Sequence, residues 1–172
     1  MPSTNAQRLR AHPMEPPLHV VLVEPEIPPN TGNVARICAA TQTPMHLVGT
    51  LGFRIDEHAV RRAGLDYWHL VEVHRHLDMA HFRHACPTSR CLLFSGKAKQ
   101  SYLDVAYRPG DALVFGRESV GLPDEWLIDH PEDVYGIPTL GAVRSLNLAN
   151  AVGIVLYEAL RQLGALGSTF QG

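Results

Sequence analysis

Residues 134–164, VYGIPTLGAVRSLNLANAVGIVLYEALRQLG, contain the pattern that decides the fold. The apolar run over residues 134–137 predicts a short β-strand, which a proline ends. After a loop, the chain takes on the apolar spacing of a helix that Ser145 or Asn147 can cap and that ends at Gly164. A strand, a loop and a polar helix start together present backbone N–H groups to a ligand.

The composition is that of one globular domain. The 172 residues are 45% hydrophobic and 19% charged, and a net charge of −2 gives no overall positive field that would indicate nucleic acid. Three cysteines without paired spacing indicate a reduced, cytoplasmic protein. No apolar run reaches the roughly 20 residues that span a membrane, so we expect no membrane partner. We predict a flexible extension over residues 1–18, a domain over residues 19–164 and a tail over residues 165–172.

Apolar runs alternate with helical patterns along the domain. Strands are predicted over residues 19–24, 45–48, 68–73, 91–94, 112–115 and 134–137, and helices over residues 34–41, 57–63, 78–85, 124–128 and 145–164. This alternation predicts an α/β fold, a mostly parallel sheet with helices on both faces. The prolines and glycine of residues 25–33 predict a rigid loop between the first strand and the first helix.

Four loops at the ends of predicted strands are rich in glycine, proline, asparagine and charge: residues 30–36, 95–99, 116–121 and 138–147. Because ligands collect at the carboxyl ends of strands in open α/β sheets, we expect these loops to form one site. The loop 116–121 lacks the motifs that bind ATP or NAD, and a purely structural turn is an alternative there. Glu118 and Arg36 also have a plain alternative, as solvent-facing charges.

The basic residues nearest this site are few. Lys97 and Lys99 are the only lysines in the chain and share one loop, while Arg117 and Arg144 belong to two others. Together these four are the candidate RNA-binding residues, because a weakly acidic protein must attract RNA through a local cluster. A solvated loop explains the lysine pair equally well.

The histidines of the middle segment invite a comparison with zinc sites: His69, His74, His76, His81 and His84. Their spacing matches no metal-binding pattern, and no cysteine pair joins them. We therefore predict no metal and place these histidines at the surface or an interface. Cys38 stands among apolar residues and is expected in the core.

Three ordered motifs resemble the signatures of the SPOUT (SpoU–TrmD) RNA methyltransferases. They are NTGNVARICA at residues 30–39, FGRESVGLP at residues 115–123, and IP followed by RSLNLAN within residues 137–150. The match is closest to the TrmL (YibK-like) subgroup, which VEPEIPPN at residues 23–30 and RRAGLDY at residues 61–67 also resemble. That subgroup consists of tRNA (cytidine/uridine-2′-O)-methyltransferases that act at the wobble position.

The resemblance implies an α/β fold with a C-terminal trefoil knot, a homodimer, tRNA as partner and S-adenosylmethionine as cofactor, released as S-adenosylhomocysteine. The implied cofactor-binding residues are Phe94, Ser95, Gly116, Glu118, Gly121, Ile137, Leu140, Ser145, Leu146 and Asn147. Non-catalytic binding of RNA or cofactor, action on another RNA, and use of a different nucleotide are the alternatives.

The resemblance also implicates Arg36 in the transfer of the methyl group to a ribose hydroxyl. Deprotonating an arginine at pH 7 costs roughly 7 kcal/mol or more, so a literal base is unfavourable. We expect Arg36 to orient the ribose and phosphate and to stabilise the developing alkoxide. Asn33 and Ser145 are expected to assist by hydrogen bonds.

Overall fold

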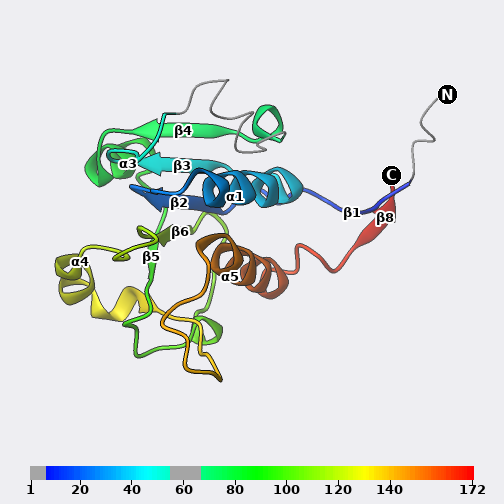
Figure 1. The fold of residues 1–172 in the computed structure, drawn as a ribbon. Coiled ribbons are helices and arrows are strands. Elements are labelled where there is room, and N and C mark those ends of the chain that lie inside the picture. Colours follow the sequence, from blue (N-terminus) through cyan, green and yellow to red (C-terminus); the bar gives the residue numbers. More distant parts are fainter. Residues whose placement is uncertain (1–6, 55–66) are drawn as a thin grey trace.

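The computed structural model describes residues 7–54 and 67–172 (Figure 1). Its central sheet is entirely parallel, in the order β4-β3-β2-β6-β5-β7. The strands are β2 His19–Val23, β3 Met45–Val48, β4 Val73–His76, β5 Cys91–Phe94, β6 Ala112–Phe115 and β7 Val134–Tyr135. The predicted α/β class is confirmed, and the helix predicted over residues 57–63 lies outside the described residues.

Helices pack on both faces of the sheet. The helices α1 Pro28–Thr41 and α5 Leu148–Gln162 lie together on one face (Figure 1), and the helices α3 Met79–Ala85 and α4 Asp124–Asp129 add side chains to the core on the other. Successive strand residues alternate between the two cores, as the pleat of a strand requires. Short 3₁₀ turns at η1 Trp68–Leu70, η2 Tyr102–Asp104 and η3 Pro131–Asp133 complete the connections.

The first helix begins earlier than predicted. The loop predicted through residues 25–33 is wrong from Pro28 onward, because α1 starts there with Ile27 as its N-cap. Proline fits the first positions of a helix, where its missing N–H would have no partner in any case. The helix start, including buried Asn30, is therefore held close to the carboxyl end of β2.

The strand predicted over residues 68–73 is also displaced. Trp68–Leu70 forms a 3₁₀ turn, and β4 covers Val73–His76. The neighbouring strand explains the shift: β3 begins at Met45, which pairs with Val73, so earlier residues have no strand to bond to. The β7 strand likewise ends at Tyr135, two residues before the predicted limit.

The last helix follows the prediction closely. Asn147 caps α5, and Gly164 adopts a left-handed φ of 72° just past its end. Val152 and Val155 are fully buried beneath the helix, in the core that it shares with α1. The trefoil knot that the family resemblance implies stays a prediction.

The two ends of the chain pair with each other. The strand β1 Leu9–Ala11 lies antiparallel to β8 Thr169–Gln171, and this ribbon projects away from the sheet (Figure 1). The predicted extension and the predicted tail thus each contain a short strand, and the domain limits stay a prediction. Of the helices that the structure describes, not one is long and apolar enough to cross a membrane.

Candidate functional site

Reciprocal hydrogen bonds join the loops after β2 and β6. These neighbouring strands lie where the sequence order of the strands in the sheet changes direction. One carboxylate oxygen of Glu118 accepts hydrogen bonds from the backbone N–H groups of Glu26, at 2.8 Å, and Ile27, at 2.9 Å. Glu26 returns the contact by accepting from the Ser119 hydroxyl at 2.6 Å and from its N–H at 3.1 Å. These reciprocal bonds fix the approach of the chain to α1, at the position where open α/β sheets bind ligands.

The two carboxylates respond differently to this environment. Burial raises the pKa of Glu118, and the N–H groups of Glu26 and Ile27 oppose that effect by stabilising the charged form. The Ser119 hydroxyl and N–H lower the pKa of Glu26. Glu118 thus braces the loop by accepting backbone hydrogen bonds, and its predicted contact with a cofactor stays a prediction.

The β6 loop is a closed turn that requires glycine at both ends. Arg117 and Gly121 exchange backbone hydrogen bonds of 3.2 and 2.9 Å. A Cβ atom on Gly116 would lie 2.2 Å from the carbonyl carbon of Gly121, and Gly121 itself has a φ of +73°. The loop is therefore a tight turn, and whether it also binds a ligand, as the site prediction has it, stays a prediction.

The loops after β5 and β7 lie side by side. Gly136 accepts from the N–H of Tyr102 and donates to the carbonyl of Gln100, both at 2.8 Å. A Cβ on Gly136 would meet the Ser95 carbonyl at 2.9 Å, and one on Gly96 would lie 3.9 Å from the carbonyl of Arg144. The structure therefore brings the predicted segments 95–99 and 138–147 together.

Asn147 connects this second pair of loops to α1. Its side-chain oxygen accepts from the N–H groups of Ala149, at 2.9 Å, and Asn150, at 3.3 Å, and so caps α5. Its amide nitrogen donates to the side-chain oxygen of Asn30 at 2.9 Å. One side chain thus fixes the start of α5 against the start of α1, and sequence reasoning did not assign this role to Asn30.

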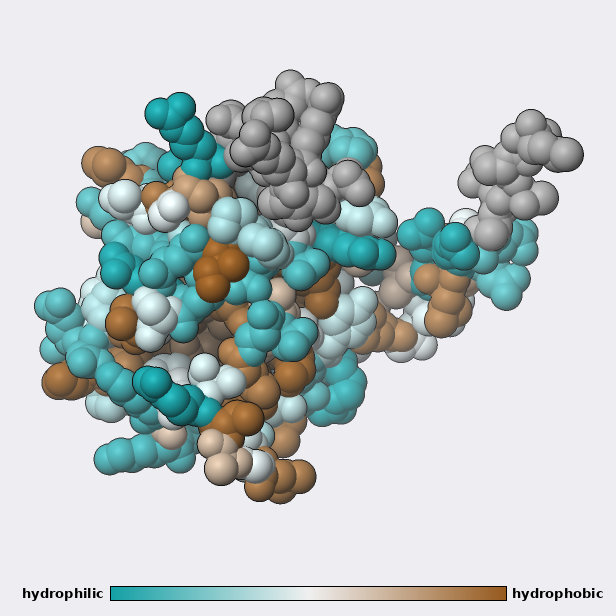
Figure 2. Space-filling view, viewed as in Figure 1, coloured by the Kyte–Doolittle hydropathy of each residue, from teal (hydrophilic) through white to brown (hydrophobic). Residues whose placement is uncertain are grey.

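The loop over residues 138–145 is exposed along its whole length. Figure 2 shows apolar side chains gathered over this part of the face, and Leu140 is fully exposed. Within the described residues, the backbone N–H groups of residues 139–146 donate to no protein acceptor. Exposed donors beside apolar side chains suit a ligand that is flat, apolar and rich in hydrogen-bonding edges.

The predicted cofactor residues differ in exposure. Phe94 and Gly116 are buried, and Phe94 stacks on Phe115 with ring centroids 5.1 Å apart. The half-buried members are Ser95, Glu118, Gly121, Ile137 and Leu146, and the exposed members are Leu140, Ser145 and Asn147. All belong to loops at the carboxyl edge of the sheet or to the strand end beneath them, as predicted.

Arg36 and Asn33 lie on the exposed side of α1. The Arg36 guanidinium carbon is 4.7 Å from the centroid of the Tyr67 ring, a cation–π contact. In the described residues, Arg36 makes no hydrogen bond to the loops that carry the cofactor residues. Sequence reasoning assigned no role to Tyr67, although the RRAGLDY stretch that ends there was a usable signal.

Two of the four predicted RNA-binding side chains are paired with acids. Lys97 contacts Asp124 at 2.7 Å, and Arg117 contacts Glu24 at 2.6 Å. Lys99 and Arg144 are exposed and have no acidic partner among the described residues. Exposed ion pairs contribute only about 0–1 kcal/mol, so an RNA phosphate can replace either acid at small cost.

The histidine prediction needs a correction, because His76 is buried and bonded to the buried His46 at 2.9 Å. In the described residues, none of the candidate metal-donor groups includes a residue of the loop site.

Burial raises the pKa of the Cys38 thiol to about 12. Its predicted core position is confirmed, and the thiol is unsuited to nucleophilic chemistry.

Comparison with known proteins gives consistent results. The model of the SpoU rRNA methylase family matches residues 17–157. The chain is 46% identical over 152 residues to the tRNA (cytidine(34)-2′-O)-methyltransferase of Aeromonas hydrophila, covering 88% of this chain and 97% of that protein. A structure solved to study 2-OH methylation of C/U34 on tRNA has 48% identity and a TM-score of 0.79, covering 85% of this chain and 95% of that one.

A second solved structure, an AdoMet-bound rRNA methyltransferase from Sinorhizobium meliloti, is 28% identical with a TM-score of 0.74. It covers 88% of this chain, but this chain covers only 59% of that protein. The likeness to these proteins therefore extends over most of the present chain, including all four loops of the candidate site.

Proposed function

The chain belongs to the SpoU rRNA methylase family, and from that membership we propose that it is a tRNA 2′-O-methyltransferase that modifies the wobble cytidine or uridine. One observation carries the choice of substrate. The chain is 46% identical to a tRNA (cytidine(34)-2′-O)-methyltransferase, of which it covers 97%, but only 28% identical to the rRNA methyltransferase.

The residues of the loop site fit S-adenosylmethionine as cofactor. Ile137 and Leu146 offer apolar surface, and the N–H groups of residues 139–146 offer donors to an adenine and a carboxylate. S-adenosylmethionine, when bound, supplies an electrophilic methyl group on a sulfonium. The AdoMet-bound family relative supports this assignment.

In the proposed reaction, bound S-adenosylmethionine would supply its methyl group to the ribose 2′-oxygen. The main task of the protein is to hold the nucleophile in line with the breaking bond. Arg36 orients the ribose and phosphate and stabilises the developing negative charge. Tyr67 limits the motion of the guanidinium, and Asn33 and Ser145 contribute hydrogen bonds.

The RNA surface in this proposal comprises Lys97, Lys99, Arg117 and Arg144. Lys99 and Arg144 are available to phosphates directly, whereas Lys97 and Arg117 must first exchange an acid for a phosphate. Such exchange is inexpensive because both pairs are exposed. Binding should therefore depend on salt, since each neutralised phosphate releases counterions.

A homodimer is part of the proposal, and α5 indicates where to test it. Ile154 and Tyr157 are 39% and 43% exposed on this helix. Val152 and Val155, in contrast, are fully buried within the chain itself, so a charge there would disrupt folding rather than report on a dimer. Ile154→Lys should yield a folded monomer in sedimentation velocity, with Arg161→Glu as the control on the same helix. A wild-type monomer at micromolar concentration would contradict the dimer.

The activity is tested with purified protein, unmodified tRNA and S-adenosylmethionine labelled in the methyl group. Mass spectrometry of the digested tRNA should locate one methyl group, on the 2′-oxygen of nucleotide 34. An anticodon stem-loop in which that ribose lacks its 2′-hydroxyl should accept none. A methylated base, or methylation at another position, would overturn the proposal. Tight binding of both ligands without transfer would favour the non-catalytic alternative.

A further inference from the structure

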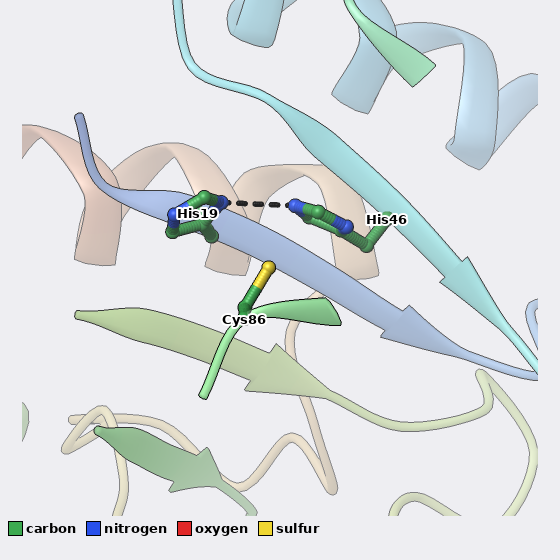
Figure 3. A group of neighbouring side chains, drawn as sticks. All are labelled: His19, His46 and Cys86. Carbon is green, nitrogen blue, oxygen red and sulfur yellow. Dashed lines mark hydrogen bonds between the residues drawn. The ribbon is translucent and has the colours of Figure 1, made fainter. Parts of the chain in front are cut away.

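Three potential metal ligands converge away from the loop site. His19 is the first residue of β2, His46 the second residue of β3, and Cys86 follows the last residue of α3. A donor atom from each lies within 4.8 Å of the other two. Figure 3 shows the two imidazole rings facing each other, with the Cys86 sulfur directed toward the space beside them. We propose that His19, His46 and Cys86 bind a divalent transition-metal ion of the zinc type.

The distance between the two imidazoles requires only a small adjustment. His19 Nδ1 and His46 Nε2 are 2.9 Å apart, whereas two nitrogens bound to a tetrahedral zinc lie about 3.3 Å apart. A nitrogen and a thiolate sulfur bound to the same ion lie about 3.6 Å apart. The donor atoms here lie within 4.8 Å of one another, so the Cys86 sulfur would have to move closer to the two rings. The ion would take the place of the hydrogen bond between the two imidazoles, and solvent would complete the four ligands.

A chain of further histidines supports the orientation of His46. Its other ring nitrogen, Nδ1, lies 2.9 Å from His76 Nε2, and His76 Nδ1 lies 2.8 Å from His81 Nδ1. Histidine ligands to metals almost always donate their second N–H to such a partner, which fixes the tautomer and the ring plane. His76 is therefore already placed as the hydrogen-bond partner that His46 would need as a metal ligand.

The surroundings also suit an ion. His46 is buried, and the edge of the Phe82 ring packs against it. Cys86 also lines a hollow of about 300 Å³ at the amino end of β5.

The prediction of no metal relied on the spacing of the histidines from His69 to His84. The proposed donors come from three separate elements, so no local spacing could reveal them. The ion would link β2 and β3 to the end of α3, in the amino half of the sheet. It would stabilise the fold and would lie apart from the loops after the strand carboxyl ends, so this inference does not rest on the proposed methyl transfer.

The test is a titration of the full-length protein with ZnCl₂, after dialysis against a chelator and in the presence of a reductant that binds no metal. We expect one zinc per chain. His19→Gln and Cys86→Ser, at half-buried positions, each remove a proposed ligand. Each should weaken zinc binding at least about a hundredfold, because losing only the hydrogen-bond partner of a ligand already costs up to about a hundredfold. His76→Gln removes only such a partner and should weaken binding about ten- to a hundredfold.

Cobalt(II) supplies a second measurement. The wild-type complex should show a thiolate-to-cobalt charge-transfer absorption that Cys86→Ser abolishes. His84→Gln, Cys91→Ser and His130→Gln are the controls, because they change an exposed helix histidine, the nearby second thiol and a residue of a separate candidate donor group. Zinc should also raise the melting temperature of the wild type but not of His19→Gln.

The expected results are a specific loss in the ligand variants, with transfer to tRNA unchanged by chelation. The absence of zinc binding to the reduced wild type would overturn the proposal. Equal zinc affinity in the wild type, His19→Gln and Cys86→Ser would also overturn it, as would a loss confined to the control variants. Failure of methyl transfer in every sample would refute the proposed function and leave the zinc result to stand on its own.

Discussion

Asn147 should contribute to stability through two separate sets of hydrogen bonds, and each can be removed in turn. Its side-chain oxygen caps α5 through Ala149 and Asn150, and its amide donates to Asn30 at 2.9 Å. Loss of an N-cap costs about 1 kcal/mol. Loss of the second bond leaves Asn30, which is only 8% exposed, with one partner fewer and costs about 1 kcal/mol more.

Asn147→Ala should therefore lower the free energy of unfolding by about 2 kcal/mol. For a chain of 172 residues this corresponds to a fall of roughly 4–8 °C in melting temperature. Asn147→Ser keeps a good capping oxygen but is too short to reach Asn30, so it should lose about half as much. Urea denaturation followed by circular dichroism gives both values, with exposed Asn150→Ala as the control.

The same two variants, Asn147→Ala and Asn147→Ser, also report on cofactor binding. Release of the Asn30 contact frees the loop 138–147 relative to α1, so both variants should raise the Kd for S-adenosylmethionine. A loss below about 0.5 kcal/mol for Asn147→Ala would refute the two-bond account. Equal losses for Ala and Ser would assign the whole effect to the contact with Asn30.

Three further predictions concern other parts of the molecule. Arg36→Ala should keep the affinity for S-adenosylmethionine in calorimetry but lower the single-turnover transfer rate about a hundredfold, and full activity would exclude the catalytic role. Replacing both Lys97 and Lys99 with alanine should weaken tRNA binding and flatten its salt dependence, and an unchanged slope would remove this loop from the RNA surface. In metal-free buffer, stability should fall as the pH drops from 6.5 to about 3, because burial lowers the pKa of His46 to about 3 while the unfolded residue binds a proton at 6.5. Urea denaturation across this range should give a shallower slope for His46→Gln, and identical slopes would contradict the assignment.

The strands were predictable where the sequence gives one unambiguous signal. The runs at β5 and β6 are continuously apolar and are followed by glycine or polar loops, which is typical of strands buried on both faces. The start of α1 was not predictable in the same way, because a pair of prolines indicates either a loop or the first turn of a helix. Only the packing of the following residues, such as buried Val34 and Cys38, decides between the two.

The site was predictable as a set of loops but not as a set of contacts. Motif order places residues 116–121 and 137–147 at strand ends, and the topology brings them to one edge of the sheet. The bond between Asn30 and Asn147 joins residues 117 positions apart. The three donors of the proposed metal site are similarly distant in sequence. Such contacts follow from the tertiary arrangement, which local spacing does not specify.

The charges at the carboxyl edge of the sheet are sorted in a way that bears on how RNA can approach. Glu24, Glu26 and Glu118 all belong to the interlocked loops after β2 and β6, and of the basic candidates only Arg117 lies among them. The loops after β5 and β7 carry Lys97, Lys99 and Arg144 instead. A phosphate backbone is therefore attracted mainly to the second pair of loops, and to the first pair only where Arg117 exchanges Glu24 for a phosphate.

The RNA should therefore cross the loops of β5 and β7, with the reactive ribose turned toward α1. This orientation predicts that Lys99 and Arg144 lower the Kd for tRNA, whereas Arg36 acts mainly on the transfer rate. The carboxylates of the acidic loops would then have a second role besides stabilising the turn. Their negative charge favours a cationic sulfonium nearby. Replacing Glu26 with glutamine should accordingly weaken binding of S-adenosylmethionine more than binding of the neutral S-adenosylhomocysteine. Equal effects on the two ligands, measured by calorimetry, would show that the carboxylate acts through the loop alone.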